Sequence, residues 1–134
     1  KDVDPLLVVD NLTKTFPGCT RPTVDGVSFH VCPGEVLTLL GPSGCGKTTT
    51  LRAVMGFERA ERGRVRRGDA VLQDDRAFLP PEKRGIGFVF QDYALFPHLS
   101  VIGNVMFGVR GESRRRRRQI AREAIWTLGL MGYE

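Results

Sequence analysis

The residues best suited to chemistry in this 134-residue chain lie between Gly41 and Thr48 and read Gly-Pro-Ser-Gly-Cys-Gly-Lys-Thr. The run fits the pattern Gly-x-x-x-x-Gly-Lys-Ser/Thr of a phosphate-binding loop. Glycines let consecutive backbone N–H groups turn toward phosphate oxygens, and a following helix directs its own N–H groups at the same anion. The motif predicts that Lys47 contacts the β- and γ-phosphates of a nucleoside triphosphate and that the Thr48 hydroxyl binds Mg²⁺.

Such a loop has to join a strand to a helix, and the flanking residues favour that arrangement. Residues 35–40 form a short apolar run that predicts a strand, and residues 48–55 predict a helix that ends at Gly56. A Gly-rich turn with an incidental lysine is the alternative, and the strand–loop–helix context argues against it.

The rest of the chain predicts two further groups of elements. Short strands are expected at residues 6–9, 24–31 and within 64–79, and a strand buried on both faces at 85–90. Ser100 and Ser113 are expected to cap two helices, the first spanning 101–107. The apolar stripe of the second helix contains Ile120, Ala121, Ala124, Ile125, Leu128 and Met131. Trp126 lies off this stripe, as a packing residue at its rim or as a contact for a partner.

Composition and charge limit the function classes. The hydrophobic content of 41% and the charged content of 26% are those of a soluble globular protein with one modest core. No apolar run is long enough to span a membrane, and the start does not resemble a signal peptide. Cys19, Cys32 and Cys45 have no metal-ligand spacing and predict reduced thiols in a cytoplasmic compartment. His30 and His98 are expected to be structural.

The net charge of +5 comes from one feature, the run Arg114–Arg118. Without these five arginines, the remaining cations and anions balance, so the charge gives no general indication of nucleic-acid binding. A solvated helix face is the expected reading of the run. A contact with phosphates or lipid headgroups and a nucleic-acid site remain as alternatives, the latter testable by its salt dependence.

Three separated motifs resemble those of the ATP-binding subunit of ATP-binding-cassette (ABC) transporters. They are the segment 12–16 ending in Phe16, the phosphate loop at 41–49, and the segment 88–100 in which Gln91 follows an apolar strand. The resemblance implies an α/β fold with the RecA-like core of phosphate-loop NTPases. The chain is expected to carry the first half of that core with an antiparallel β subdomain and the start of a helical subdomain, and to lack the C-terminal half. The expected division is into residues 1–91, with the β subdomain and first part of the core, and 92–134, with the glutamine-loop continuation and the helical subdomain.

The resemblance also implies residue roles around a cofactor of ATP and Mg²⁺. The ring of Phe16 is expected to stack on adenine. The backbone amides of Ser43, Gly44, Cys45, Gly46 and Lys47 are expected to hold the β-phosphate, with Thr49 near the α-phosphate. Thr48 and Gln91 are expected to bind Mg²⁺, and Gln91 to approach the attacking water. Lys47 and Gln91 are thus the candidate catalytic residues.

Partners follow from the same resemblance. The segment Tyr93–Leu99 is expected to receive a helix of a transmembrane permease subunit, with a buried aromatic cluster as the alternative. A second ATP-binding subunit is expected to complete a homodimer, and a periplasmic or surface solute-binding protein to act indirectly; nucleic acid is not an expected partner. This places the chain peripherally on the cytoplasmic face of the inner (plasma) membrane. Segments 95–101 and 104–109 look most like importer ATPases for ferric iron, polyamines, sulfate or sugars, iron being the first expectation.

Several parts that the family needs for turnover are absent from these 134 residues. There is no Leu-Ser-Gly-Gly-Gln signature, no strand ending in Asp-Glu and no later switch histidine. Phosphoryl transfer needs a positioned water, a metal and charge stabilisation together. We therefore expect the full-length protein to be an ATPase and these residues alone to hydrolyse ATP weakly or not at all. The alternatives are a nucleotide-binding interaction module without turnover and an unrelated small-molecule kinase.

Overall fold

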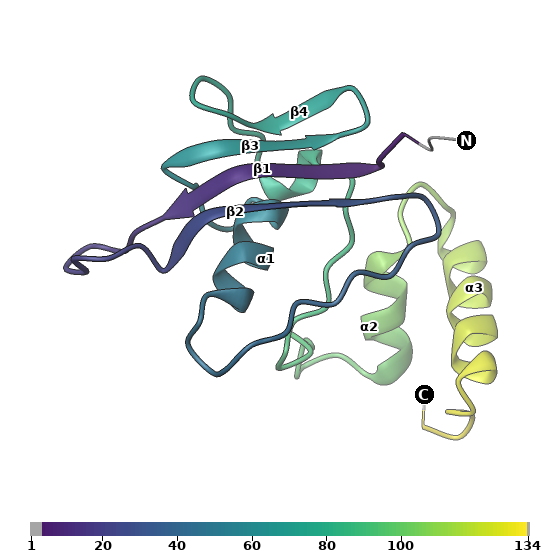
Figure 1. The fold of residues 1–134 in the computed structure, drawn as a ribbon. Coiled ribbons are helices and arrows are strands. Elements are labelled where there is room, and N and C mark those ends of the chain that lie inside the picture. The colour runs from purple at the N-terminus through teal and green to yellow at the C-terminus, as the bar shows by residue number, and fades with distance from the viewer. Residues whose placement is uncertain (1–3, 134) are drawn as a thin grey trace. The chain divides into compact units, whose positions relative to one another are not determined.

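The structure, a computed structural model, describes residues 4–133. These residues divide after Phe88 into two compact units, a sheet with one helix and a helical pair (Figure 1). No helix in residues 4–133 is long and apolar enough to cross a lipid bilayer.

The first unit is built on a four-stranded antiparallel sheet with the strand order β2-β1-β3-β4. The strands are β1 (Leu7–Lys14), β2 (Val24–Val31), β3 (Arg62–Arg67) and β4 (Ala70–Gln73). Helix α1 (Lys47–Met55) packs its buried side against one face of the sheet (Figure 1). The core between them contains Val9, Leu12, Val65 and Leu72 from the strands and Ala53 and Val54 from α1.

Strand β1 is longer than the sequence predicts, because it continues from Val9 to Lys14 through an irregularity in its pairing. The register with β2 and with β3 shifts between residues 9 and 14, and Asn11 has a φ of 48° there. A bulge of this kind turns the strand and interrupts the alternation of apolar and polar residues. The interruption explains why the apolar pattern alone stops at Val9.

Two strands expected from the sequence are absent from the structure. Residues 35–40 and 85–90 are irregular, and no strand of residues 4–133 pairs with either. Val36 is 90% exposed and Leu40 is 88% exposed. Because a strand exists only where a neighbour completes its ladder of hydrogen bonds, an apolar run without such a neighbour stays irregular. The prediction of these two strands is therefore wrong for this chain.

The second unit consists of α2 (Val101–Gly108) and α3 (Arg114–Thr127), which pack against each other. Both predicted caps are confirmed, because Ser100 Oγ accepts from Gly103 N and Ser113 Oγ accepts from Arg116 N, each at 3.3 Å. A short 3₁₀ helix, η1 (Pro81–Lys83), precedes Arg84 in the first unit. The predicted stripe of α3 is buried at Ala121 and Ile125, whereas Leu128 and Met131, beyond the helix, are exposed.

Candidate nucleotide-binding site

Two glycines give the phosphate loop its curvature directly before α1. Gly44 and Gly46 have φ angles of 81° and 94°, in the left-handed region where only glycine is unstrained. A Cβ atom on Gly46 would lie 2.3 Å from the backbone oxygen of Thr23. Gly46 is therefore required twice, for the turn into the helix and for the close approach of the chain that follows the β1–β2 loop.

The N-terminus of α1 presents backbone donors that fit an anion. In residues 4–133, no acceptor bonds to the backbone N–H of Lys47, Thr48 or Thr49, and the capping residue Gly46 has no side chain to offer. The first intrahelical bond is Thr50 N to Gly46 O, at 2.8 Å. Unpaired N–H groups and the positive end of the helix dipole together suit a phosphate.

Lys47 lies over the mouth of this loop. Its Nζ donates to the carbonyl oxygens of Gly41 at 2.7 Å and Pro42 at 2.6 Å and lies 3.6 Å from Cys45 Sγ. The ammonium group is thus held by main-chain carbonyls at the rim rather than by a carboxylate. A triphosphate entering the loop would meet a cation whose charge is unneutralised.

The loop that carries Phe16 lies beside the phosphate loop. Thr23 N donates to Lys14 O at 2.8 Å and closes this loop at its base, and Thr23 O is the atom that approaches Gly46. Phe16 is half-buried, with Lys14 Nζ 5.3 Å from its ring centroid. The stacking of adenine on this ring stays a prediction.

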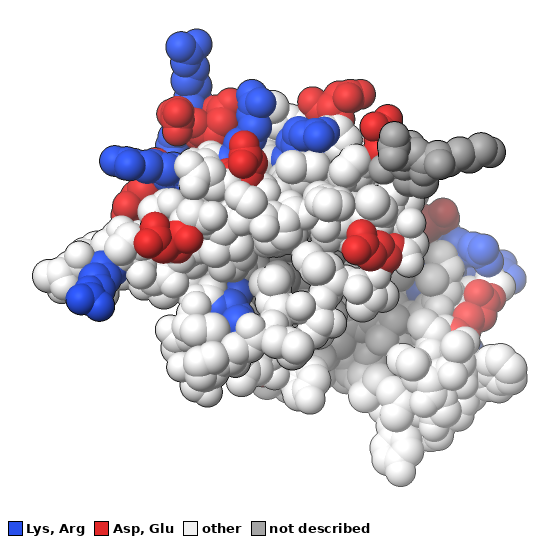
Figure 2. All heavy atoms as spheres, viewed as in Figure 1, with Lys and Arg blue, Asp and Glu red and all other residues white. Residues whose placement is uncertain are grey.

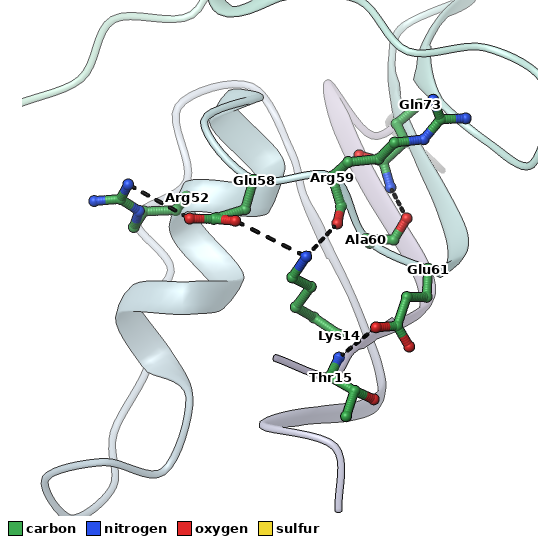
Figure 3. A network of polar contacts seen from close by, with 8 residues as sticks. All are labelled: Lys14, Thr15, Arg52, Glu58, Arg59, Ala60, Glu61 and Gln73. Atoms are coloured by element: carbon green, nitrogen blue, oxygen red, sulfur yellow. Dashed lines mark hydrogen bonds and ion pairs between the residues drawn. The ribbon is translucent and has the colours of Figure 1, made fainter. Parts of the chain in front are cut away.

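A polar network fixes the end of β1 just before Phe16 (Figure 3). Lys14 Nζ donates to Arg59 O at 3.0 Å and lies 3.9 Å from Glu58, which also pairs with Arg52 of α1 at 3.5 Å. Next to it, Thr15 N donates to Glu61 at 3.1 Å. The connector after α1 therefore holds the strand end from which Phe16 projects. Sequence reasoning missed Lys14 as a positioning residue.

Arg84 is the second residue that sequence reasoning missed, and it is 1% exposed. Its Nη1 donates to the last-turn carbonyls of α1, Ala53 O at 2.9 Å and Val54 O at 2.7 Å, and its Nε donates to Leu79 O at 2.7 Å. Burial lowers the pKa of its guanidinium. A cation at the C-terminal end of a helix opposes the negative end of the dipole, so Arg84 anchors the helix whose other end faces the phosphate.

The remaining candidate residues lie in the second unit. Gln91 is exposed and lies in a turn, so its roles beside Mg²⁺ and water stay predictions. The segment Tyr93–Leu99 presents exposed side chains, with Tyr93 74% exposed and Leu95 68% exposed, and Phe96 packs on Phe107 of α2 at 4.4 Å between ring centroids.

Asn104 of α2 holds the end of this segment. Its Oδ1 accepts from Phe96 N at 2.9 Å, and its Nδ2 donates to Phe96 O, Leu99 O and Ser100 O at 3.1–3.2 Å. An amide inside an otherwise apolar helix was the available signal for this role, and sequence reasoning did not use it.

The metal site predicted from the sequence would depend on hydroxyl and amide oxygens rather than on an acidic cluster. Among residues 4–133, no group of three or more His, Cys, Asp or Glu side chains is placed to hold a metal ion. The Thr48 side chain is exposed at the start of α1, a position that fits a hard cation bound together with phosphate. Cys19, Cys32 and Cys45, which all lie in the described residues, form no disulfide.

The loop before α1 requires glycine, the N-terminus of α1 has no side-chain cap, and Lys47 lies at the rim of the loop. Together these features define a phosphate-loop protein of the nucleotide-binding class. The chain belongs to the ABC transporter family, which its sequence matches over residues 24–134.

Relatives of this chain include ATP-binding proteins of several uptake systems. The chain is 44% identical to the diacetylchitobiose uptake system ATP-binding protein MsiK of Streptomyces coelicolor, over 92% of this chain and 32% of that protein. It is 48% identical to the spermidine/putrescine import ATP-binding protein PotA of Marinobacter nauticus, over 81% and 28% of the two chains. It is 41% identical to the Fe(3+) ions import ATP-binding protein FbpC of Agrobacterium fabrum, over 94% and 35%.

Solved structures of ABC cassettes share the fold. A dimeric, post-hydrolysis state of the cassette MJ0796 bound to ADP and Pi has a TM-score of 0.77 and 27% identity, covering 94% of this chain and 58% of that one. The chain spans about a third of the length of the three uptake-system relatives MsiK, PotA and FbpC. The α/β fold of an ABC ATPase cassette, with its antiparallel β subdomain, is confirmed for the first part of such a cassette.

Proposed function

We propose that this chain is the nucleotide-binding part of an ABC importer ATPase, which binds Mg·ATP through the phosphate loop and powers the uptake of a small solute. The observation that carries the proposal is the arrangement of Lys47 and the unpaired N–H groups of α1 around one loop. The importer relatives support the coupling to uptake. Residues 1–91 supply the β subdomain and the first part of the core, and residues 92–134 begin the helical subdomain.

Each loop residue has a distinct task in this proposal. The amides from Ser43 to Lys47 hold the β-phosphate, the Lys47 ammonium neutralises the β- and γ-oxygens, and Thr49 lies near the α-phosphate. Phe16 offers an aromatic face to the base. When bound by Thr48 and Gln91, Mg²⁺ neutralises charge on the transferring phosphoryl group. The Gln91 side chain orients the attacking water in the whole protein.

We propose that the transported substrate is a small solute, and we do not specify it further. The relatives are named for diacetylchitobiose, spermidine/putrescine, Fe(3+) ions and, putatively, 2-aminoethylphosphonate. Ferric iron is therefore one of four cargo classes at similar identity.

The proposed partners are a transmembrane permease, a second ATP-binding subunit and, indirectly, a solute-binding protein. The exposed side chains of Tyr93–Leu99, held by Asn104, suit a groove for a permease helix. The dimeric cassettes support the pairing of two subunits. This assembly would place the chain at the cytoplasmic face of the membrane.

Calorimetry of Mg·ATP binding, with phosphate release followed on the same sample, tests the proposal. Replacing Lys47 by Ala should weaken binding roughly 10- to 150-fold, because a charge-assisted contact contributes about 1.5–3 kcal/mol. Lys83→Ala is the matched control, because Lys83 is an exposed lysine of the same unit. Equal affinities of the two variants would contradict the proposed role of the loop.

The second candidate function is a nucleotide-binding interaction module that does not hydrolyse ATP. It differs from the importer ATPase in one measurement, the release of phosphate. Both candidates predict binding that depends on Lys47 and Phe16. Phosphate release from the longer protein supports the ATPase, and binding without release there supports the module. A kinase-like site would bind ATP equally well after Phe16→Ala.

A further inference from the structure

Helix α3 presents a strongly basic face whose arginines form no ion pair within the described residues. Its first turn contains arginines and no acidic residue, at the end of the helix where the dipole is already positive. Within residues 4–133, no ion pair joins a carboxylate to any arginine of the run Arg114–Arg118 or to Arg122. Arg117 does not belong to the outward-facing arginines, because its guanidinium points toward α2 and donates to Met106 O.

The outward arginines form a stripe with an aromatic end. Arg115, Arg118, Arg122 and Trp126 follow one another at spacings of three or four residues, which places them on one side of a helix. All four are exposed, whereas Ala121 and Ile125 of the same helix are buried. We call these four residues the basic face. From Arg115 to Trp126, eleven residues further along the chain, it extends for roughly 16 Å along the helix axis.

A shallow groove runs along this face. It has a volume of about 360 Å³ and is lined by Arg115, Arg118, Gln119, Arg122 and Glu123. Glu123 is the one carboxylate in the lining, and its Oε1 accepts from Gln119 Nε2 at 3.0 Å. In the view of Figure 2, blue side chains lie where Figure 1 draws the upper turns of α3, with red ones beside them.

We propose that the basic face of α3 binds the phosphate headgroups of an anionic lipid bilayer. The planar guanidinium of arginine matches a phosphate with two parallel hydrogen bonds. The indole of Trp126 is 72% exposed and is the side chain that prefers the boundary between headgroups and acyl chains. The subunit would thus contact the membrane directly, in addition to any contact through a permease.

The apolar residues that follow the basic face favour a lipid surface over nucleic acid. Leu128 is 70% exposed, Met131 is 54% exposed and Tyr133 is 72% exposed. These residues lie just beyond the end of α3. A basic helix face followed by exposed aliphatic and aromatic side chains supplies the cationic and apolar groups that bind the surface of an anionic bilayer. Nucleic-acid bases would stack on Trp126, but nucleic-acid binding does not require exposed aliphatic side chains beside the tryptophan.

The single tryptophan makes the test direct, because Trp126 is the only one in the chain. Its fluorescence should shift to shorter wavelength on vesicles of phosphatidylcholine mixed with phosphatidylglycerol, and concentrated salt should reverse the shift. Vesicles of phosphatidylcholine alone should leave the spectrum unchanged. The variant Arg115→Gln/Arg118→Gln/Arg122→Gln should bind the anionic vesicles on the order of 100-fold more weakly, at about fivefold per arginine.

The matched control is Arg21→Gln/Arg62→Gln/Arg76→Gln, which removes the same charge from exposed arginines of the first unit. It should retain vesicle binding, and circular dichroism should show equal helix content in both variants. Equal losses in the two variants, an equal shift on uncharged vesicles, or no shift on anionic ones would overturn the proposal. Tighter binding to oligothymidine than to anionic vesicles at the same salt would replace it by a nucleic-acid site.

This inference goes beyond the proposed function, and the two can fail separately. Vesicle binding requires neither Lys47 nor Mg·ATP, and calorimetry of Mg·ATP requires no lipid. A chain that binds nucleotide but ignores anionic vesicles would keep the proposed function and lose the inference.

Discussion

Gly46 shows how a single residue links the parts of the candidate site. Its φ of 94° admits the turn into α1, and its missing side chain admits Thr23 O from the neighbouring loop. A larger residue there would move the loop of Phe16 away from the phosphate loop. The sequence motif predicts this glycine for the turn, but only the structure shows the second constraint, because Thr23 lies 23 residues earlier in the chain.

Cys45 gives the first prediction at the scale of the residue. Its thiol is exposed and lies 3.6 Å from Lys47 Nζ, so an alkyl group on Sγ would occupy the space that we propose for the phosphates. Alkylation with N-ethylmaleimide should weaken Mg·ATP binding about 10-fold or more, as the loss of one charge-assisted contact does. Calorimetry before and after treatment measures the change.

Because Cys19 and Cys32 are also cysteines outside any disulfide, the control is the variant Cys45→Ser. This variant should bind nucleotide normally and lose nothing on treatment, and Mg·ATP should protect the unsubstituted chain from labelling at Cys45. Inhibition that persists in Cys45→Ser would show that the relevant thiol lies elsewhere.

At the scale of the element, α1 depends on Arg84 at the end opposite to the phosphate loop. Gly56 ends the helix, and a Cβ there would lie 2.5 Å from Arg84 Nε, so the glycine leaves room for the guanidinium. Replacing Arg84 by Met would remove the guanidinium donor from two buried carbonyls, those of Ala53 and Val54, and Ala53 O would retain only its bond from Gly56 N. We expect a loss of about 1.5–3 kcal/mol in the free energy of unfolding, or a fall in Tm of roughly 5–15 °C.

Thermal unfolding followed by circular dichroism measures this difference. Lys83→Met is the matched control, since Lys83 is exposed, adjacent in the chain and should change stability by less than about 0.5 kcal/mol. A Tm of Arg84→Met equal to that of the control would show that the buried guanidinium does not stabilise α1.

The turn after β4 gives a prediction about pH. Backbone N–H groups of Ala77 and Arg76 donate to Asp74 Oδ1 at 2.7 and 2.9 Å, and these bonds, the one from Ala77 first, lower the pKa of the Asp74 carboxyl. A lowered pKa in the folded state means that the ionised carboxylate stabilises the fold above the ordinary aspartate pKa. That contribution is lost as the pH falls through the lowered value.

The variant Asp74→Asn keeps an oxygen acceptor but does not titrate. The chain with Asp74 should be the more stable one at neutral pH, and the difference should narrow when the pH falls below about 3.9. Urea unfolding of both proteins across this range measures the difference. A gap that stays constant with pH would contradict the assigned role of the carboxylate.

The sequence predicted those features that depend on residues within a few positions, such as helix caps. It did not predict features that depend on contacts with residues far away in the sequence. Ser100 and Ser113 cap their helices as expected, because a cap depends on residues within one turn. The same holds for Gly56 at the end of α1. The apolar run 35–40 signals burial but cannot reveal whether a neighbouring strand exists. Arg84 lies in a charged stretch flanked by proline and glycine, a pattern that predicts an exposed turn. Its burial depends on contacts with α1, which is distant in the sequence, and so the sequence does not predict it.

At the scale of the whole molecule, stability is concentrated around β1. The buried residues Val9, Leu12 and Val65 lie in central strands with a ladder on each side, and α1 covers them. The segment 36–40, which leads into the phosphate loop, has no ladder within residues 4–133. The candidate site is therefore supported firmly on its helix side and loosely on the side of this segment.

Amide hydrogen exchange of the 134-residue chain should report this division. We expect strong protection in β1 and β3, because their amides open only with the sheet, and exchange close to the unfolded rate at residues 36–40. Mass spectrometry of peptides from both regions measures the contrast at two protein concentrations. Protection at 36–40 that rises with concentration would indicate strand pairing between copies. Protection there equal to that of β1 at both concentrations would contradict the irregular conformation of this segment.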